Sequence, residues 1–182
     1  MQQVAFKRTR RVIDARKEVY TQDRIRKGFE RSLNRRLINM FDGISKDASK
    51  FYKVNGTQGM QVYLAKIRPE VEGVIKPHWY AVIKTFAERM DDILFKRDTD
   101  FYTALLARFI NRIGASHISD IDDTTRKQLQ KTLLDAQSEG LGVDQTARQI
   151  RDRYKPQFSR RRAAVIARTE THSAASFANL SP

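Results

Sequence analysis

The side chains that could perform acid, base or metal chemistry are few and far apart in this sequence. The chain has no cysteine, and its three histidines form no His-x-x-x-His or similar ligand pair. A short acidic run lacks the glycine and final glutamate of a twelve-residue calcium loop, so helix capping explains it better than a cation site. We therefore expect no enzymatic activity, no metal and no cofactor. The residues considered are His78, His117, His172, Asp120, Asp122 and Asp123.

One carboxylate, that of Glu170, stands out because of its place on an apolar helix face. When residues 160–178 are placed on a helix, small and apolar side chains form one stripe, and Glu170 lies in the middle of it. Burying an unpaired carboxylate costs several kcal/mol, so we expect a basic or multi-donor partner and a structural role. We expect that partner to be an arginine. The candidates, which the sequence does not rank, are Arg126, Arg148 and Arg160.

The same helix begins with three consecutive arginines, Arg160, Arg161 and Arg162. Cations are disfavoured near the positive end of a helix dipole. A bound phosphate would relieve this, and so would acidic side chains of a neighbouring helix or subunit. The sequence leaves both interpretations open.

Positive charge is concentrated at the N-terminus. The formal net charge is +14, and residues 1–36 contain twelve Lys or Arg against four acids, which gives +8 and leaves +6 for the rest. Such asymmetry is typical of a segment facing packaged DNA, RNA or an acidic protein, although a solvated helical face is the alternative. No groove-reading motif is present, so we expect contact with the phosphate backbone. The candidate DNA-binding residues are Lys7, Arg8, Arg10, Arg11, Arg16, Lys17, Arg24, Arg26, Lys27, Arg160, Arg161 and Arg162.

The run Ile166-Ala167-Arg168-Thr169-Glu170 resembles the signature helix of the Mu F-like minor head proteins of tailed bacteriophages. The resemblance covers about residues 115–178, and its structural motif corresponds to Arg168, Thr169 and Glu170. The order of the preceding elements is also similar. They are Asp123-Thr124-Thr125-Arg126 at the start of a helix, Gly140-Leu141-Gly142-Val143 as a turn, and a short helix over 147–154.

The resemblance implies a non-enzymatic phage structural protein that acts in head morphogenesis. Its expected partners are the portal protein, the major capsid protein and packaged double-stranded DNA, with several copies in each assembly. The expected location is the virion, inside the head near the portal, after synthesis in the cytoplasm of the host bacterium. The alternative is a nucleic-acid-binding helical module with no virion role. A gene neighbourhood with portal, terminase and capsid genes would favour the first.

The composition predicts a mainly α fold. With only 8 Gly and 4 Pro, the chain has few turns, which favours long helices, and no apolar run is long enough to span a membrane. We expect three regions. They are a basic helical arm over 1–56, a helical middle region over 57–114 and a Mu F-like module over 115–182.

Turn residues predict where the helices end. Apolar spacing predicts a helix over 25–48, and residues 55–59 read as a loop. Further breaks are expected at Pro77 and at Gly114. In the last region, the acidic run at 120–123 is expected to cap a helix that ends at Gly140. We expect Asp144 to cap the next helix and Pro156 to end it.

Overall fold

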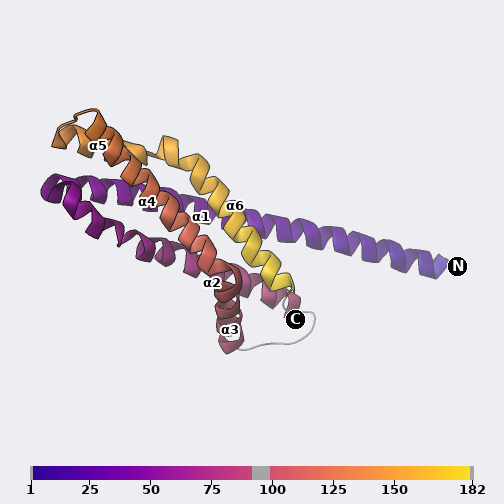
Figure 1. Ribbon diagram of the computed structural model, residues 1–182. Coiled ribbons are helices and arrows are strands. Elements are labelled where there is room, and N and C mark those ends of the chain that lie inside the picture. The colour runs from indigo at the N-terminus through magenta and orange to yellow at the C-terminus, as the bar shows by residue number, and fades with distance from the viewer. Residues whose placement is uncertain (1, 92–98, 181–182) are drawn as a thin grey trace.

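The computed structural model describes the backbone of residues 2–91 and 99–180, and their side chains apart from those of 2–16, 90–91, 99 and 156–158. Every regular element in these residues is a helix, which confirms the mainly α prediction. The helices form an elongated bundle, and the start of the first helix extends beyond it (Figure 1). One hydrophobic cluster contains residues from all three predicted regions. None of the described helices is long and apolar enough to cross a bilayer.

Helix α1 (Gln2–Leu64) is longer than the sequence pattern predicts. Leu37, Phe41 and Ile44 of its apolar stripe are fully buried, whereas Ile25 and Phe29 are partly buried. The predicted loop at 55–59 is reduced to a kink at Gly56, whose φ of 59° and ψ of −162° are accessible to glycine. Beyond the kink the chain turns back, and the Tyr63 hydroxyl donates to the Ile44 carbonyl (2.8 Å).

Helix α2 (Ile67–Asp91) continues through Pro77, so the predicted break there is wrong. A proline inside a helix costs about 3 kcal/mol through a lost backbone hydrogen bond and a steric clash. The surrounding turns bury Ile75, Trp79 and Ile83 completely. Because each such side chain contributes roughly 1.5–3 kcal/mol, the packing of α2 offsets the local penalty.

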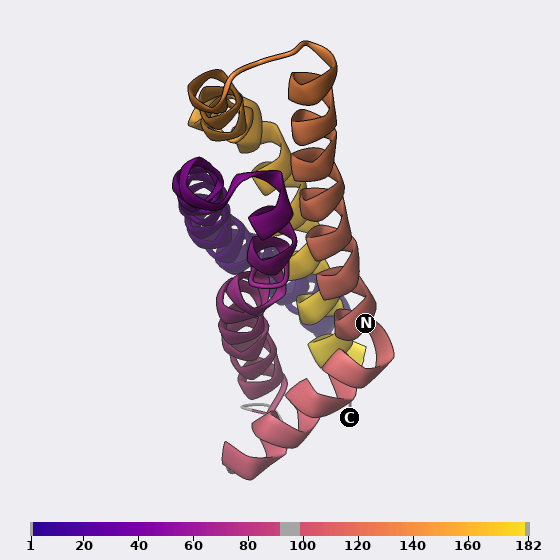
Figure 2. The ribbon, with the colours of Figure 1, turned by 60° about the vertical axis from the view of Figure 1, so that its left-hand side comes forward.

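The prediction that Gly114 ends a helix is also wrong. Helix α3 (Thr99–Phe109) passes through a π-helical turn, η1 (Ile110–Gly114), directly into α4 (Ala115–Ser138). Gly114 keeps helical backbone angles. A Cβ atom at this position would lie only 2.7 Å from Cζ3 of Trp79, so glycine allows the indole ring to pack against the chain. Figure 2 shows α3 and α4 as one bent helical path.

The two ends of α4 differ in how well the sequence predicts them. Asp122 lies inside α4, buried, and accepts a hydrogen bond from Arg126 Nε (2.8 Å), so the acidic run is not the N-cap. The C-terminal prediction is confirmed. Gly140 has a φ of 64°, and the amide of Leu141 donates to the carbonyl of Ala136 (3.0 Å), as in a Schellman motif.

Helix α5 (Val143–Arg153) is capped by Gly142 rather than by Asp144. The Gly142 amide donates to Oε1 of Gln145 (3.2 Å), while Asp144 pairs with Lys53 of α1 (2.7 Å). Pro156 follows the end of α5 and is the first residue of α6 (Pro156–Leu180). Its missing amide proton is harmless in the first turn of a helix.

Helix α6 lies against α1 and α2 (Figure 2). Its Arg162 donates a hydrogen bond to Gln128 of α4. The predicted stripe is confirmed, because Ala163, Ala167 and Ala174 are almost completely buried. Edge-to-face aromatic contacts join Trp79 to Phe109 (5.0 Å between centroids) and Phe109 to Phe177 (5.3 Å). α6 is therefore the internal packing helix that its small residues predict.

Candidate nucleic-acid interface

Part of the outward face of α1, up to residue 46, presents cations without exposed acids, whereas Asp47 further along the helix is exposed. Between residues 17 and 46, the exposed residues include seven Lys or Arg and no Asp or Glu, because the four acids of this stretch are half-buried. Five of the cations fall within about 80° of one another around the helix and span about 27 Å along it. We call these five the basic ridge. They are Lys17, Arg24, Lys27, Arg31 and Arg35.

Most charges on the basic ridge have no counterion within the described residues. Lys27 pairs with Asp23 (2.7 Å), but this pair is exposed and therefore weak. Arg31 donates from Nε to the backbone carbonyl of Lys27 (3.1 Å), which leaves its charge unneutralised. Lys17, Arg24 and Arg35 make no ion pair among the side chains that are described. A row of unneutralised cations is the electrostatic footprint expected for phosphates.

The predicted DNA-binding residues of α1 divide into three groups. Lys17, Arg24 and Lys27 lie on the basic ridge. Arg26 does not, because it faces α6 and pairs with Asp23 (2.7 Å) and Glu30 (3.6 Å). Arg31 and Arg35 are not among the predicted residues, although their steps of seven and eleven residues from Arg24 place them on the same face. The third group, Lys7, Arg8, Arg10, Arg11 and Arg16, lies outside the residues whose side chains are described.

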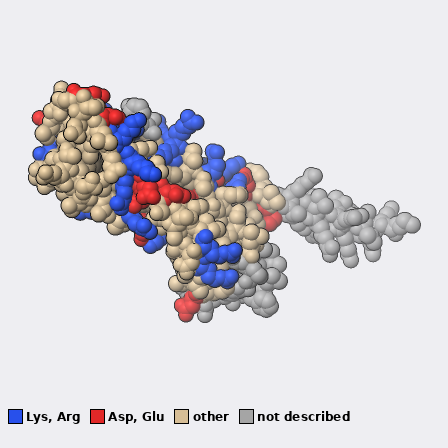
Figure 3. Space-filling model, in the orientation of Figure 1, with Lys and Arg blue, Asp and Glu red and all other residues tan. Residues whose placement is uncertain are grey.

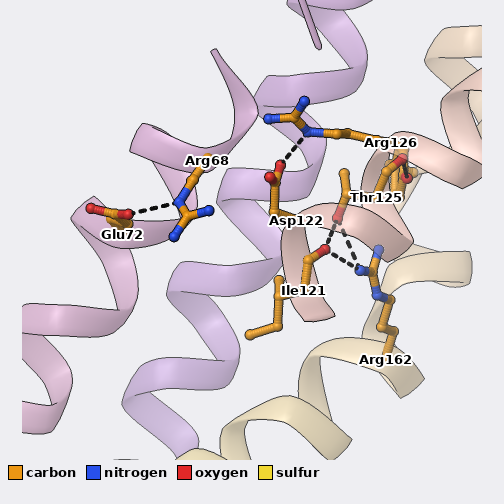
Figure 4. A network of polar contacts seen from close by, with 8 residues as sticks. Arg68, Glu72, Ile121, Asp122, Thr125, Arg126 and Arg162 are labelled. Carbon is orange, nitrogen blue, oxygen red and sulfur yellow. Dashed lines mark hydrogen bonds and ion pairs between the residues drawn. The ribbon is translucent and has the colours of Figure 1, made fainter. Parts of the chain in front are cut away.

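Arg162 is half-buried and its guanidinium is bonded within the protein, which argues against its prediction as a DNA-binding cation (Figure 4). Its guanidinium donates to Gln128 Oε1 (3.2 Å), the Ile121 carbonyl (3.1 Å) and Thr125 Oγ1 (2.9 Å). It also lies 4.6 Å from the centroid of the Phe41 ring. Burial lowers the pKa of Arg162. Neutral oxygens of α4, rather than a phosphate or acidic side chains, therefore satisfy this arginine.

Glu170 is buried, as predicted, but its partners are not arginines. Its Oε2 accepts hydrogen bonds from Trp79 Nε1 (3.1 Å) and His117 Nδ1 (3.0 Å), so one carboxylate joins α6 to α2 and α4. Burial raises the pKa of Glu170, while the hydrogen bond from His117 acts in the opposite direction. Of the expected partners, Arg126 pairs with Asp122. The other two, Arg148 and Arg160, are exposed.

The two residues after Glu170 also join α6 to its neighbours. Thr171 Oγ1 lies 2.9 Å from Nε2 of the buried His78, whose Nδ1 accepts from Arg36 (3.3 Å). Burial lowers the pKa of His78 to about 4, so this imidazole is neutral near pH 7. His172 accepts from Arg26 of α1 (3.3 Å). We call these residues and their partners the α6 clasp. It consists of Glu170, Thr171 and His172 with Trp79, His117, His78 and Arg26.

Histidines that are far apart in the sequence thus meet consecutive residues of one helix. The sequence contains no spacing that would reveal this, because His78 and His117 belong to different helices. The other two motif residues, Arg168 and Thr169, are exposed. Arg160 and Arg161 are exposed as well, and Glu170, the one acid in α6, is buried. The outward face of α6 is therefore also basic.

Positive charge does not cover the whole molecule. On the face shown in Figure 3, groups of basic side chains alternate with groups of acidic ones. Within the described residues, no three His, Asp or Glu side chains are grouped so as to hold a metal ion. No protein-family model, curated protein or solved structure matches the chain.

Proposed function

We propose that this chain is a non-enzymatic minor head protein of a tailed bacteriophage, similar to the Mu F-like proteins, and that α1 contacts packaged double-stranded DNA. The observation that supports DNA contact is the basic ridge, which offers unneutralised cations over about 27 Å without an exposed acid among them. These cations face phosphates and read no bases, so we expect no sequence preference. Binding of this kind weakens steeply as salt is added.

The α6 clasp supports the resemblance to the phage family. In the Arg168-Thr169-Glu170 motif, Glu170 is buried and ties three helices together, while Arg168 and Thr169 face outward. The motif therefore combines a packing residue with residues available to a partner. We infer that the exposed part of α6 meets the portal protein or the major capsid protein in an assembly with several copies.

The virion role is tested on phage particles from the host bacterium. Particles are purified by density gradient, and quantitative mass spectrometry measures the ratio of this chain to the portal protein. We expect a fixed ratio, with the chain inside the head and protected from added protease. Particles that contain portal and capsid proteins but lack this chain would overturn the virion role.

DNA contact is tested separately with the purified chain. Fluorescence anisotropy with two duplexes of unrelated sequence should give equal affinities and a steep salt dependence. Replacing Arg24, Arg31 and Arg35 together with Gln should weaken binding to both duplexes equally. Binding in this test combined with absence from particles would favour the alternative, a nucleic-acid-binding module outside the virion.

A further inference from the structure

An aromatic residue, Tyr20, lies among the cations of the basic ridge. Between residues 17 and 35, the arc of about 80° around α1 that holds the five ridge residues contains one further residue, and this residue is Tyr20. Along the helix axis it lies about 4.5 Å from Lys17 and about 6 Å from Arg24. A strand whose phosphates follow the ridge therefore passes over the position of Tyr20.

The exposure of Tyr20 distinguishes it from the other aromatic residues. Its surface is 73% exposed, whereas every other aromatic side chain that the structure describes is buried or half-buried. Tyr20 makes no hydrogen bond, ring contact or cation–π contact within the described residues. Packing within the chain therefore does not account for an aromatic ring at this position, and the ring is free to meet a ligand.

A ring among cations matches two requirements of binding to a single nucleic-acid strand. Lys and Arg neutralise the phosphates, and the face of an aromatic ring stacks on a base. Because every base has a π face, such stacking needs no particular sequence. This agrees with the lack of a groove-reading motif in the chain.

A duplex offers the ridge its phosphates but not the faces of its bases. Each base in a duplex is paired and stacked between its neighbours, so it reaches a protein ring only after a costly extrusion. The bases of a single strand are unpaired and can turn toward the protein. A stacking residue on the ridge should therefore act on single strands and leave duplex binding to the cations.

The preceding residue, Val19, is exposed to a similar extent but occupies a different face. It is 68% exposed, and it lies about 80° around the helix from Lys27, the nearest ridge residue in this direction. A strand held by the ridge does not pass over Val19. Substitution of Val19 is consequently a matched control for loss of exposed apolar surface next to the ridge.

We propose that Tyr20 stacks on an unpaired base of a DNA strand whose phosphates the basic ridge holds. The proposal rests on the proposed contact between α1 and DNA and adds to it a site for single-stranded DNA. The contribution of Tyr20 is not ionic, so it differs from that of the ridge cations in its salt dependence as well as in its substrate.

The test compares three probes of equal length in anisotropy titrations: a single strand, the same strand with abasic sites throughout, and the duplex. Loss of one stacked base changes affinity by roughly five- to 150-fold. Tyr20→Ala should weaken binding to the intact single strand at least about fivefold and leave the other two probes nearly unchanged. Tyr20→Phe, which keeps the ring, and Val19→Ala should both bind all three probes like the parent. Circular dichroism checks the folding of each variant.

The salt dependence separates stacking from charge. The logarithm of affinity for the intact strand falls linearly with the logarithm of salt concentration. Tyr20→Ala should lower this line without changing its slope, because stacking releases no counterions. Arg24→Gln should make the slope shallower by about 0.7, the value for one phosphate of a single strand.

Two negative outcomes are distinguishable. If none of the probes binds, or binding does not depend on salt, the proposed DNA contact itself is wrong. If the probes bind with steep salt dependence but Tyr20→Ala binds the intact strand like the parent, or loses as much affinity for the abasic strand and the duplex, the stacking role is wrong and the backbone contact stands.

Discussion

The basic ridge of α1 and the α6 clasp are built from similar residues but use them in opposite ways. On the ridge, Arg24 and Arg35 are exposed and lack a counterion among the described side chains. In the clasp and beside it, Glu170 and His78 are buried, Arg162 is half-buried, and hydrogen bonds within the protein hold all three. The number of charged residues in the sequence does not distinguish the basic ridge from the α6 clasp. Burial and hydrogen-bond partners decide which arginines can meet a ligand and which hold helices together.

The largest expected difference in the free energy of unfolding is between alanine substitutions at Arg162 and at Arg161. Arg162→Ala removes three hydrogen bonds and the contact with the Phe41 ring, and Gln128 Oε1 loses its donor. We expect a loss of about 4 kcal/mol in the free energy of unfolding. Arg161→Ala, at an exposed neighbour, should change it by less than about 0.5 kcal/mol. Urea denaturation measures both, and equal losses would contradict the distinction.

His78 should make stability depend on pH. Its folded pKa of about 4 lies below the ordinary value of 6.5, so the unfolded chain binds more protons between these values. This contribution to stability is complete above pH 6.5 and is lost as the pH falls toward 4, by roughly 3 kcal/mol. His78→Gln should flatten the dependence of unfolding free energy on pH in this window. The exposed His172→Gln should retain it, and a steep loss in both variants would show that another group is responsible.

Two substitutions of Glu170 test whether the α6 clasp stabilises the fold through charge or through hydrogen bonds. Glu170→Ala leaves Trp79 Nε1 and His117 Nδ1 without an acceptor and should cost about 2–3 kcal/mol. Glu170→Gln keeps an oxygen for both donors and leaves no buried arginine unpaired, so it should stay within about 1 kcal/mol of the parent. Thermal unfolding, followed by the fluorescence of the single tryptophan, measures both variants. A loss of about 3–5 kcal/mol in the Gln variant would instead indicate an essential charge pair.

Periodicity and local turn chemistry predicted much of this fold. The small-residue stripe of α6, the burial of Glu170 and the end of α4 at Gly140 all follow from residues close together in the chain. The wrong predictions concern positions where packing against distant residues outweighs the local conformational preference of the residue. Pro77 remains helical because of the packing around it, and Gly114 is required by the ring of Trp79.

In the candidate site, too, the features set by neighbouring residues could be predicted, and the features set by distant residues could not. The concentration of cations in α1 could be predicted, because charge and helical register are properties of the sequence alone. The sequence could not show that Arg26 and Arg162 would turn inward, since their partners, His172 and Thr125, lie far away in the chain.

The smallest expected effect is a difference in DNA binding between substitutions of Arg24 and Arg26, which are two residues apart. Arg24 is exposed without a counterion in the described residues, whereas Arg26 pairs with Asp23 and Glu30. The logarithm of duplex affinity should fall with the logarithm of salt concentration, with a slope of about −0.9 for each phosphate neutralised. Arg24→Gln should therefore make the slope shallower by about 0.9 and weaken binding several-fold. Arg26→Gln should leave the slope nearly unchanged, because its charge is already compensated within the protein. Equal changes in slope would mean that the ion pairs of Arg26 open when DNA binds, and the basic ridge would then extend toward α6.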